Sequence, residues 1–135
     1  MCKKSYVGKI YKTTDGYFTG SNHIKKPRRV AVIHQRKDDN AVAVVKIRSK
    51  KDKVSNYYIP KLILKPKNHP SLTKDSIVEN NIIVGKKEDG KFKSIYTTEF
   101  VELNDKLTRS ELRKIKKATK KSNKNKIKKW KRHFK

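Results

Sequence analysis

The 135-residue sequence has little of several residue types, and each shortage excludes a class of protein. Its single cysteine, Cys2, excludes an intramolecular disulfide framework and a zinc site built from several cysteines. No run approaches the roughly 18 consecutive apolar residues of a transmembrane helix, and no apolar segment follows the N-terminal charges as in a signal peptide. The four histidines are scattered along the chain. We therefore expect a soluble, cytoplasmic protein without a metal or other cofactor.

Acidic residues are also scarce, with 12 Asp and Glu against 38 Lys and Arg, which gives a formal net charge of +26. The last thirty residues hold 15 of these cations and one acidic residue, Glu111. Such density favours a polyanionic partner, with nucleic acid as the leading class. An anionic membrane surface and a merely solvated face are the alternatives. The residues near the C-terminus that we predict to bind nucleic acid are Lys128, Lys129, Trp130, Lys131 and Arg132.

Short apolar runs separated by frequent turns predict a mainly β protein, a small barrel or sandwich. Arg28–Gln35 and Ala41–Arg48 are rich in Val and Ile and flank a polar turn, which predicts a buried hairpin. Asp89-Gly90 predicts a second hairpin. The other predicted strands are Tyr6–Tyr11, Asn56–Ile59, Ile77–Val84 and Lys91–Phe100.

The hydrophobic period changes near the C-terminus. Thr108 is followed three residues later by Glu111, a capping-box pattern, and apolar residues then recur at helical spacing. We expect one amphipathic helix from Arg109 to about Lys121, a break at Ser122-Asn123, and a Lys-rich tail that is helical or disordered. Residues 1–121 then form one domain, and residues 122–135 form the basic tail.

Enzyme motifs such as a phosphate-binding glycine loop or a nucleophile elbow are missing, so the candidate site is a basic one. Arg28 begins a predicted strand, and an arginine guanidinium can bind a phosphate through two hydrogen bonds. If the first hairpin forms, Arg28 and Ser49 become neighbours, and His23 is the histidine best placed to face Arg28. A solvated positive edge is the alternative interpretation. The lysines and arginine that we expect to bind nucleic acid here are Lys25, Lys26, Arg29, Lys50 and Lys51.

The order of several short motifs resembles the MazF/PemK-like toxins of toxin–antitoxin systems. The motifs are GKIY, PRRVAVI, KIRS, HPSLTKDSIV and LNDKLTRSELRKI, which together span roughly Val7 to Ala118. The resemblance implies an SH3-like β-barrel with a C-terminal helix, a homodimer, and metal-independent cleavage of single-stranded RNA. It also implies attack by the ribose 2′-hydroxyl on the adjacent phosphate, and inhibition by an acidic antitoxin protein.

The resemblance assigns roles to individual residues. The family's arginine matches Arg28, and Arg29 stands in place of the proline that usually follows it. The family's catalytic threonine matches Arg48, and Ser49 matches the neighbouring serine. This departure leaves three possibilities open: Ser49 supplies the hydroxyl, Arg48 supplies a second phosphate clamp, or the protein binds RNA without cutting it. In the catalytic case, His23 assists proton transfer.

Overall fold

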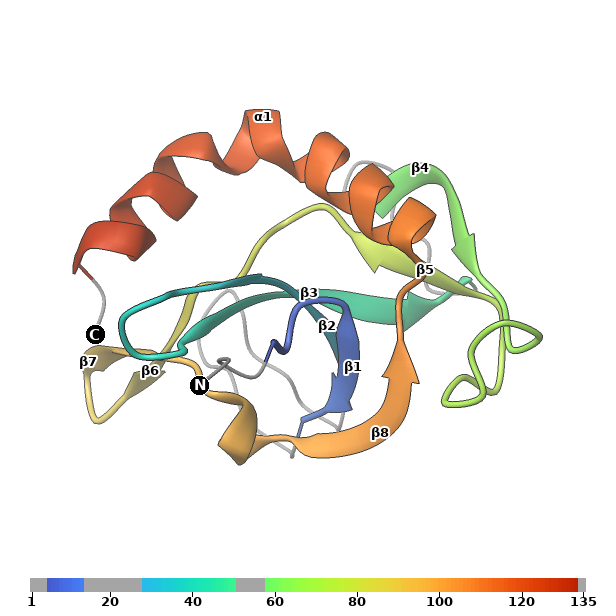
Figure 1. Cartoon of the computed structure of the whole chain (residues 1–135), viewed down its shortest axis with the longest axis horizontal. Helices are drawn as coiled ribbons and strands as arrows, with labels where there is room; N and C mark the ends of the chain where they lie inside the picture. The colour runs from blue at the N-terminus through green and yellow to red at the C-terminus, as the bar shows by residue number, and fades with distance from the viewer. Residues whose placement is uncertain (1–4, 14–27, 51–57, 134–135) are drawn as a thin grey trace.

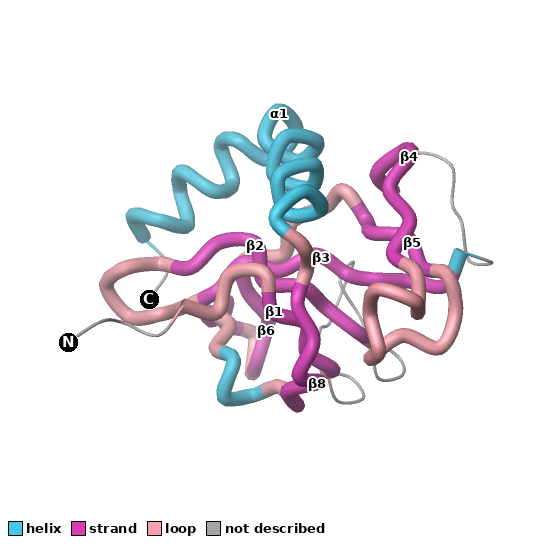
Figure 2. Tube along the Cα trace, turned by 45° about the vertical axis from the view of Figure 1, so that its right-hand side comes forward, coloured by secondary structure: helices cyan, strands magenta, loops and turns pink. Residues whose placement is uncertain are grey.

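The computed structural model describes residues 5–13, 28–50 and 58–133. A six-stranded antiparallel sheet with the strand order β4-β5-β3-β2-β1-β8 carries a long helix across one face, and a small hairpin, β6-β7, stands beside it (Figures 1 and 2). The elements are β1 (Lys9–Lys12), β2 (Arg29–Gln35), β3 (Val42–Ser49), β4 (Tyr58–Leu64), β5 (Ser76–Glu79), β6 (Gly85–Glu88), β7 (Lys91–Ser94), the 3₁₀ turn η3 (Thr97–Glu99), β8 (Val101–Lys106) and α1 (Arg109–His133).

The predicted hairpin is the centre of the sheet, where β2 pairs with β3 in antiparallel register. Its strands have continuous runs of apolar residues, without alternating polar ones, because both faces of the sheet are covered. Ala31 and Val45 pack into the core beneath α1, whereas Val30 and Val44 pack into a second core on the opposite face. The prediction of a buried hairpin is confirmed.

The mainly β class is confirmed, but the sheet is not closed into a barrel. In the strand order, β4 and β8 form the two ends, and in the described part of the chain they do not pair with each other. The predicted strand Ile77–Val84 is also interrupted, because β5 ends at Glu79. The chain then rejoins β3 through one bridge, between Ile83 and Val44.

The second predicted hairpin is confirmed at Asp89-Gly90, which connects β6 and β7. Both residues have positive φ, 54° and 76°, as a two-residue type I′ turn requires. The predicted strand Lys91–Phe100, however, is wrong beyond Ser94. The chain passes through η3 and then forms β8, which pairs with β1 near the other end of the sequence.

The helix begins where the capping box predicts. The Glu111 N–H donates to Thr108 Oγ1 (3.2 Å), and the Thr108 N–H donates to Glu111 Oε1 (2.8 Å). The predicted end near Lys121 is wrong, because α1 continues to His133. Asn123 does not break the helix, since its amide donates to the carbonyls of Thr119 (2.9 Å) and Asn80 (3.1 Å).

The second half of α1 belongs to the same core as the sheet. Trp130 is 0% exposed and packs in the cluster that contains Ile10, Ile33 and Leu64. Midway along the helix, the Thr119 hydroxyl donates to the Ile115 carbonyl (2.8 Å), a contact that bends helices. Figure 1 shows α1 arching over the sheet, so residues 122–133 are not a detached tail. Within the described ranges, no helix is both long and apolar enough to cross a membrane.

Candidate nucleic-acid interface

The predicted arginine site lies where the start of β2 is beside the end of β3. Arg29 pairs with Ile47, so the same register places Arg28 across from Arg48, with Ser49 one residue further along. The backbone of Arg28 is fixed by Thr13, whose N–H donates to the Arg28 carbonyl (2.8 Å) and whose Oγ1 accepts from the Arg28 N–H (3.1 Å). The hairpin therefore brings the two strand ends together as predicted, although Arg48 instead of Ser49 is the direct neighbour of Arg28.

Arg48 is linked to a carboxylate on the next strand. Its Nη1 lies 3.4 Å from Oε2 of Glu79 on β5, and the Glu79 side chain is only 12% exposed. The Nε of Arg48 is buried and has no hydrogen-bond partner in the part of the chain that the structure describes. A guanidinium with one donor on a carboxylate still has donors that can bind a phosphate oxygen. Glu79, however, partly neutralises its charge.

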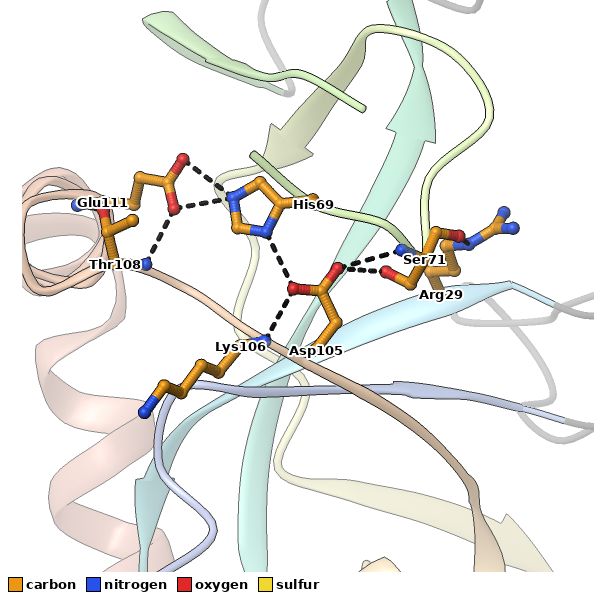
Figure 3. A network of polar contacts seen from close by, with 7 residues as sticks. All are labelled: Arg29, His69, Ser71, Asp105, Lys106, Thr108 and Glu111. Carbon is orange, nitrogen blue, oxygen red and sulfur yellow. Dashed lines mark hydrogen bonds and ion pairs between the residues drawn. The ribbon is translucent and has the colours of Figure 1, made fainter. Parts of the chain in front are cut away.

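Arg29 has a different surrounding from Arg28, because successive residues of a strand point to opposite faces. It shares the face of Ile47, which belongs to the core beneath α1. Its Nε donates to the carbonyl of Ser71 (2.7 Å), which places Arg29 beside the polar network in Figure 3. Arg28 and Arg48 therefore share one face of the sheet, and Arg29 is on the other.

That network centres on His69, which has no exposed surface. Its Nδ1 lies 3.1 Å from Asp105 Oδ1, and its Nε2 lies 2.8 Å from Glu111 Oε1 (Figure 3). Burial lowers the pKa of His69, but the hydrogen bonds and charges of Glu111 and Asp105 outweigh burial, so the pKa is raised above 6.5. The His69 imidazole thus ties the β4–β5 connection to the end of β8 and the start of α1.

The arrangement of these groups is structural, not that of a nucleophile and its base. The Ser71 hydroxyl donates to Asp105 Oδ2, and among the described residues the hydrogen-bond partners of the His69 ring are Asp105 and Glu111. A nucleophilic serine would instead need its hydroxyl on the imidazole. In the described ranges, no group of three or more His, Cys, Asp or Glu side chains is arranged to hold a metal ion.

The assignment of Trp130 to a nucleic-acid surface is wrong. Its side chain is fully buried, and the Arg36 guanidinium lies 5.4 Å from the centre of its ring. Arg36 Nη1 also donates to the Trp130 carbonyl (2.8 Å). An indole that is buried in this way cannot stack on a base. Its neighbours Lys129 and Lys131 are exposed, as expected for phosphate contacts.

The other predicted residues have mixed outcomes. Lys50 and Lys128 have exposed side chains. His23, Lys25, Lys26 and Lys51 lie outside the described residues, and the side chain of Arg132 is likewise not described. The roles of these five residues stay predictions.

Five further cations of α1, between Arg109 and Lys124, were not among the predicted site residues. Together with two of the predicted lysines they form one line of exposed side chains, which we call the basic row: Arg109, Arg113, Lys117, Lys120, Lys124, Lys128 and Lys131. An open, shallow hollow of about 430 Å³ lies along its first half. The signal that was available in the sequence is their spacing of three or four residues, which places side chains on one face of a helix.

No protein-family model matches the chain, and a search of curated proteins gives no significant match. The resemblance to the MazF/PemK-like toxins therefore depends on the short motifs alone. Any functional assignment depends on the chain's own residues: the arginines where β2 and β3 meet, the hydroxyl of Ser49, and the cations of α1.

Proposed function

We propose that the protein binds single-stranded RNA at the place where β2 begins and β3 ends. We further propose that it cuts this RNA without a metal, in the manner of the toxins it resembles. The observation that carries the proposal is the register that puts Arg28 beside Arg48, with Ser49 next in the chain. Two guanidiniums on neighbouring strands can hold the oxygens of one phosphate from two sides. The same proposal includes an acidic antitoxin protein as inhibitor and a homodimer as the active form.

An SH3-like fold is part of this proposal. The consecutive antiparallel strands β1, β2 and β3, and a helix that follows the last strand, support it. The open sheet counts against a closed barrel.

In the proposed reaction, the ribose 2′-oxygen attacks the adjacent phosphorus and forms a new P–O bond. The bond from phosphorus to the 5′-oxygen breaks, and the products are a cyclic 2′,3′-phosphate and a free 5′-hydroxyl. The proton of the 2′-hydroxyl passes to a base, and the 5′-oxygen takes up a proton as it leaves. Arg28 and Arg48 stabilise the charge on the non-bridging oxygens, Ser49 orients the phosphate, and His23 stays the candidate for proton transfer.

A second candidate function is a non-catalytic module that binds RNA or DNA with the same fold. The observation that favours it is the ion pair of Arg48 with Glu79, because Arg48 stands where the toxins that the chain resembles have a catalytic threonine. A residue held by a largely buried carboxylate is suited to a fixed binding contact. This function would give tight, salt-dependent binding of intact nucleic acid.

The experiment that separates the two functions incubates the protein with a mixed single-stranded RNA in excess EDTA and maps the ends of any fragments. Arg28→Ala is compared with Lys91→Ala, which removes an equal charge from an exposed position on β7. Cyclic phosphate ends that depend on Arg28 and not on Lys91 support the nuclease. Intact RNA that is nevertheless bound by the protein supports the binding module.

A further inference from the structure

The basic row runs along nearly the whole of α1. Its seven members follow one another at intervals of four, four and three residues, and this pattern occurs twice between Arg109 and Lys131. At about 1.5 Å per residue, the row is about 33 Å long, and its members are about one helical turn apart. All seven side chains are exposed.

The side of α1 that faces the sheet also has residues at intervals of three or four. Its buried or half-buried residues are Leu112, Ile115, Thr119, Asn123, Ile127 and Trp130. Because both lines of residues share one period, the basic row stays in solvent along the full length of the helix while the other line stays against the sheet. The structure therefore holds the cations in a single, continuous line.

The row has no acidic counterpart. The only acidic residue of α1 is Glu111, and its carboxylate is bound to His69. In the segments that the structure describes, no carboxylate makes an ion pair with a member of the row. Like charges one turn apart destabilise a helix, so this line of cations has a cost that a bound polyanion would remove.

We propose that the basic row binds the phosphate backbone of an RNA duplex, as a second site distinct from the paired ends of β2 and β3. Single strands are typically held by aromatic side chains that stack on bases, and the only Phe, Tyr or Trp of α1 is the buried Trp130. A duplex has its bases already stacked and offers a line of phosphates to a line of cations. The row contacts phosphates only, so it binds without sequence preference.

The two sites belong to opposite faces of the sheet. Ile47 packs into the core beneath α1, so its neighbour Arg48, and Arg28 across from it, belong to the other face. The choice of RNA over DNA rests on the proposed function. The duplex site itself does not need the strand-end site to be catalytic.

The test measures binding of the full chain to a blunt RNA duplex of about 20 base pairs by fluorescence anisotropy, in EDTA, over a series of salt concentrations. Seven phosphate contacts give a slope of about −6 in a plot of log K against log salt concentration. The triple variant Lys117→Gln, Lys120→Gln and Lys124→Gln reduces that slope by about three, and weakens binding at about 0.15 M salt by about a hundredfold.

The matched control is Lys61→Gln, Lys67→Gln and Lys91→Gln, which removes the same charge from exposed positions outside α1. We expect it to change the affinity for the duplex less than threefold. Equal losses in the two triple variants would mean that only net charge matters and would overturn the proposal. Circular dichroism melting of both variants confirms that each is folded.

The same binding assay is repeated with other ligands. Tighter binding of a DNA duplex overturns the assignment to RNA, and tighter binding of a single strand overturns the assignment to a duplex. Binding of phosphatidylglycerol vesicles that depends on the row, with no binding of the duplex, makes the row a membrane site instead. Arg28→Ala should leave duplex binding unchanged, and the row variant should leave cleavage of a short single strand unchanged, so each proposal can fail without the other.

Discussion

Replacing His69 with alanine removes the imidazole that contacts both carboxylates of a buried cluster. The side chains of Asp105 and Glu111 are only 4% and 14% exposed, and each bonds one ring nitrogen of His69. Removing one partner of a buried ion pair costs about 3–5 kcal/mol, because the remaining charge stays buried. We expect the lower end of this range, since the Asp105 carboxylate still accepts from the Lys106 N–H (2.8 Å) and Glu111 from the Thr108 N–H (2.8 Å).

The assay is urea unfolding followed by circular dichroism over a range of pH. The pKa of His69 is raised in the folded protein above its ordinary value of 6.5, so the folded state binds the proton more tightly than the unfolded state. The stabilisation by His69 is therefore complete below pH 6.5 and is lost as pH rises through the raised pKa of the folded state. The difference between wild type and His69→Ala should be largest in mild acid and should shrink in alkali.

His34→Ala is the matched control, because it also removes a histidine, but the pKa of His34 is lowered by burial and by the charges of Lys116 and Lys131. Its removal should not produce a stability difference that falls as pH rises. The reasoning about His69 would be refuted if the free energy of unfolding fell by less than about 1 kcal/mol, because breaking even one buried ion pair costs more than that. It would also be refuted if the stability difference stayed constant from mild acid to alkali.

Three further predictions concern other parts of the molecule. Arg28→Ala should slow RNA cleavage by about two to three orders of magnitude, because one preorganised donor lowers the barrier by about 3–4 kcal/mol. A single-turnover assay measures the rate, and a rate loss below about tenfold would remove Arg28 from the mechanism. Trp130→Ala should destabilise the fold by about 3–5 kcal/mol in urea unfolding, whereas a tail residue would cost almost nothing. Burial and the charges of Lys116 and Lys131 lower the pKa of His34 to about 4, so wild type should lose stability as pH falls from 6.5 towards 4; His34→Gln should lose less over that range, and equal acid sensitivity would contradict the assignment.

The parts of the fold that sequence could predict are those whose signals are local. The unbroken apolar runs of β2 and β3, the Asp89-Gly90 turn and the capping box of Thr108 each involve residues that are close in the sequence. β8 has no such signal, because its partner β1 lies about ninety residues earlier. The end of α1 was also mispredicted for a tertiary reason: Asn123 is satisfied by the Asn80 carbonyl and the Ile82 N–H.

The candidate site also has parts that local sequence signals predict and parts that depend on tertiary contacts. The register of one hairpin is enough to bring Arg28 to the end of β3, so this placement could be predicted from sequence. The ion pair of Arg48 with Glu79 could not, because it depends on β5 lying beside β3. The periodic spacing of the cations on α1 was visible in the sequence, but their use as one row required the helix to continue beyond Ser122-Asn123.

The basic row has a fixed position because α1 is held to the sheet along its length. At its start, Glu111 is bound to His69, and in its second half the Lys126 amine donates to the Ile82 carbonyl (2.9 Å). Near its end, the Trp130 carbonyl accepts from Arg36, a buried cation that is itself paired with Asp39 at 2.5 Å. A cation at this end also complements the negative end of the helix dipole. Because these contacts lie on the side of α1 that faces the sheet, phosphate binding on the exposed side needs no rearrangement of the helix, and the binding free energy is not spent on ordering it.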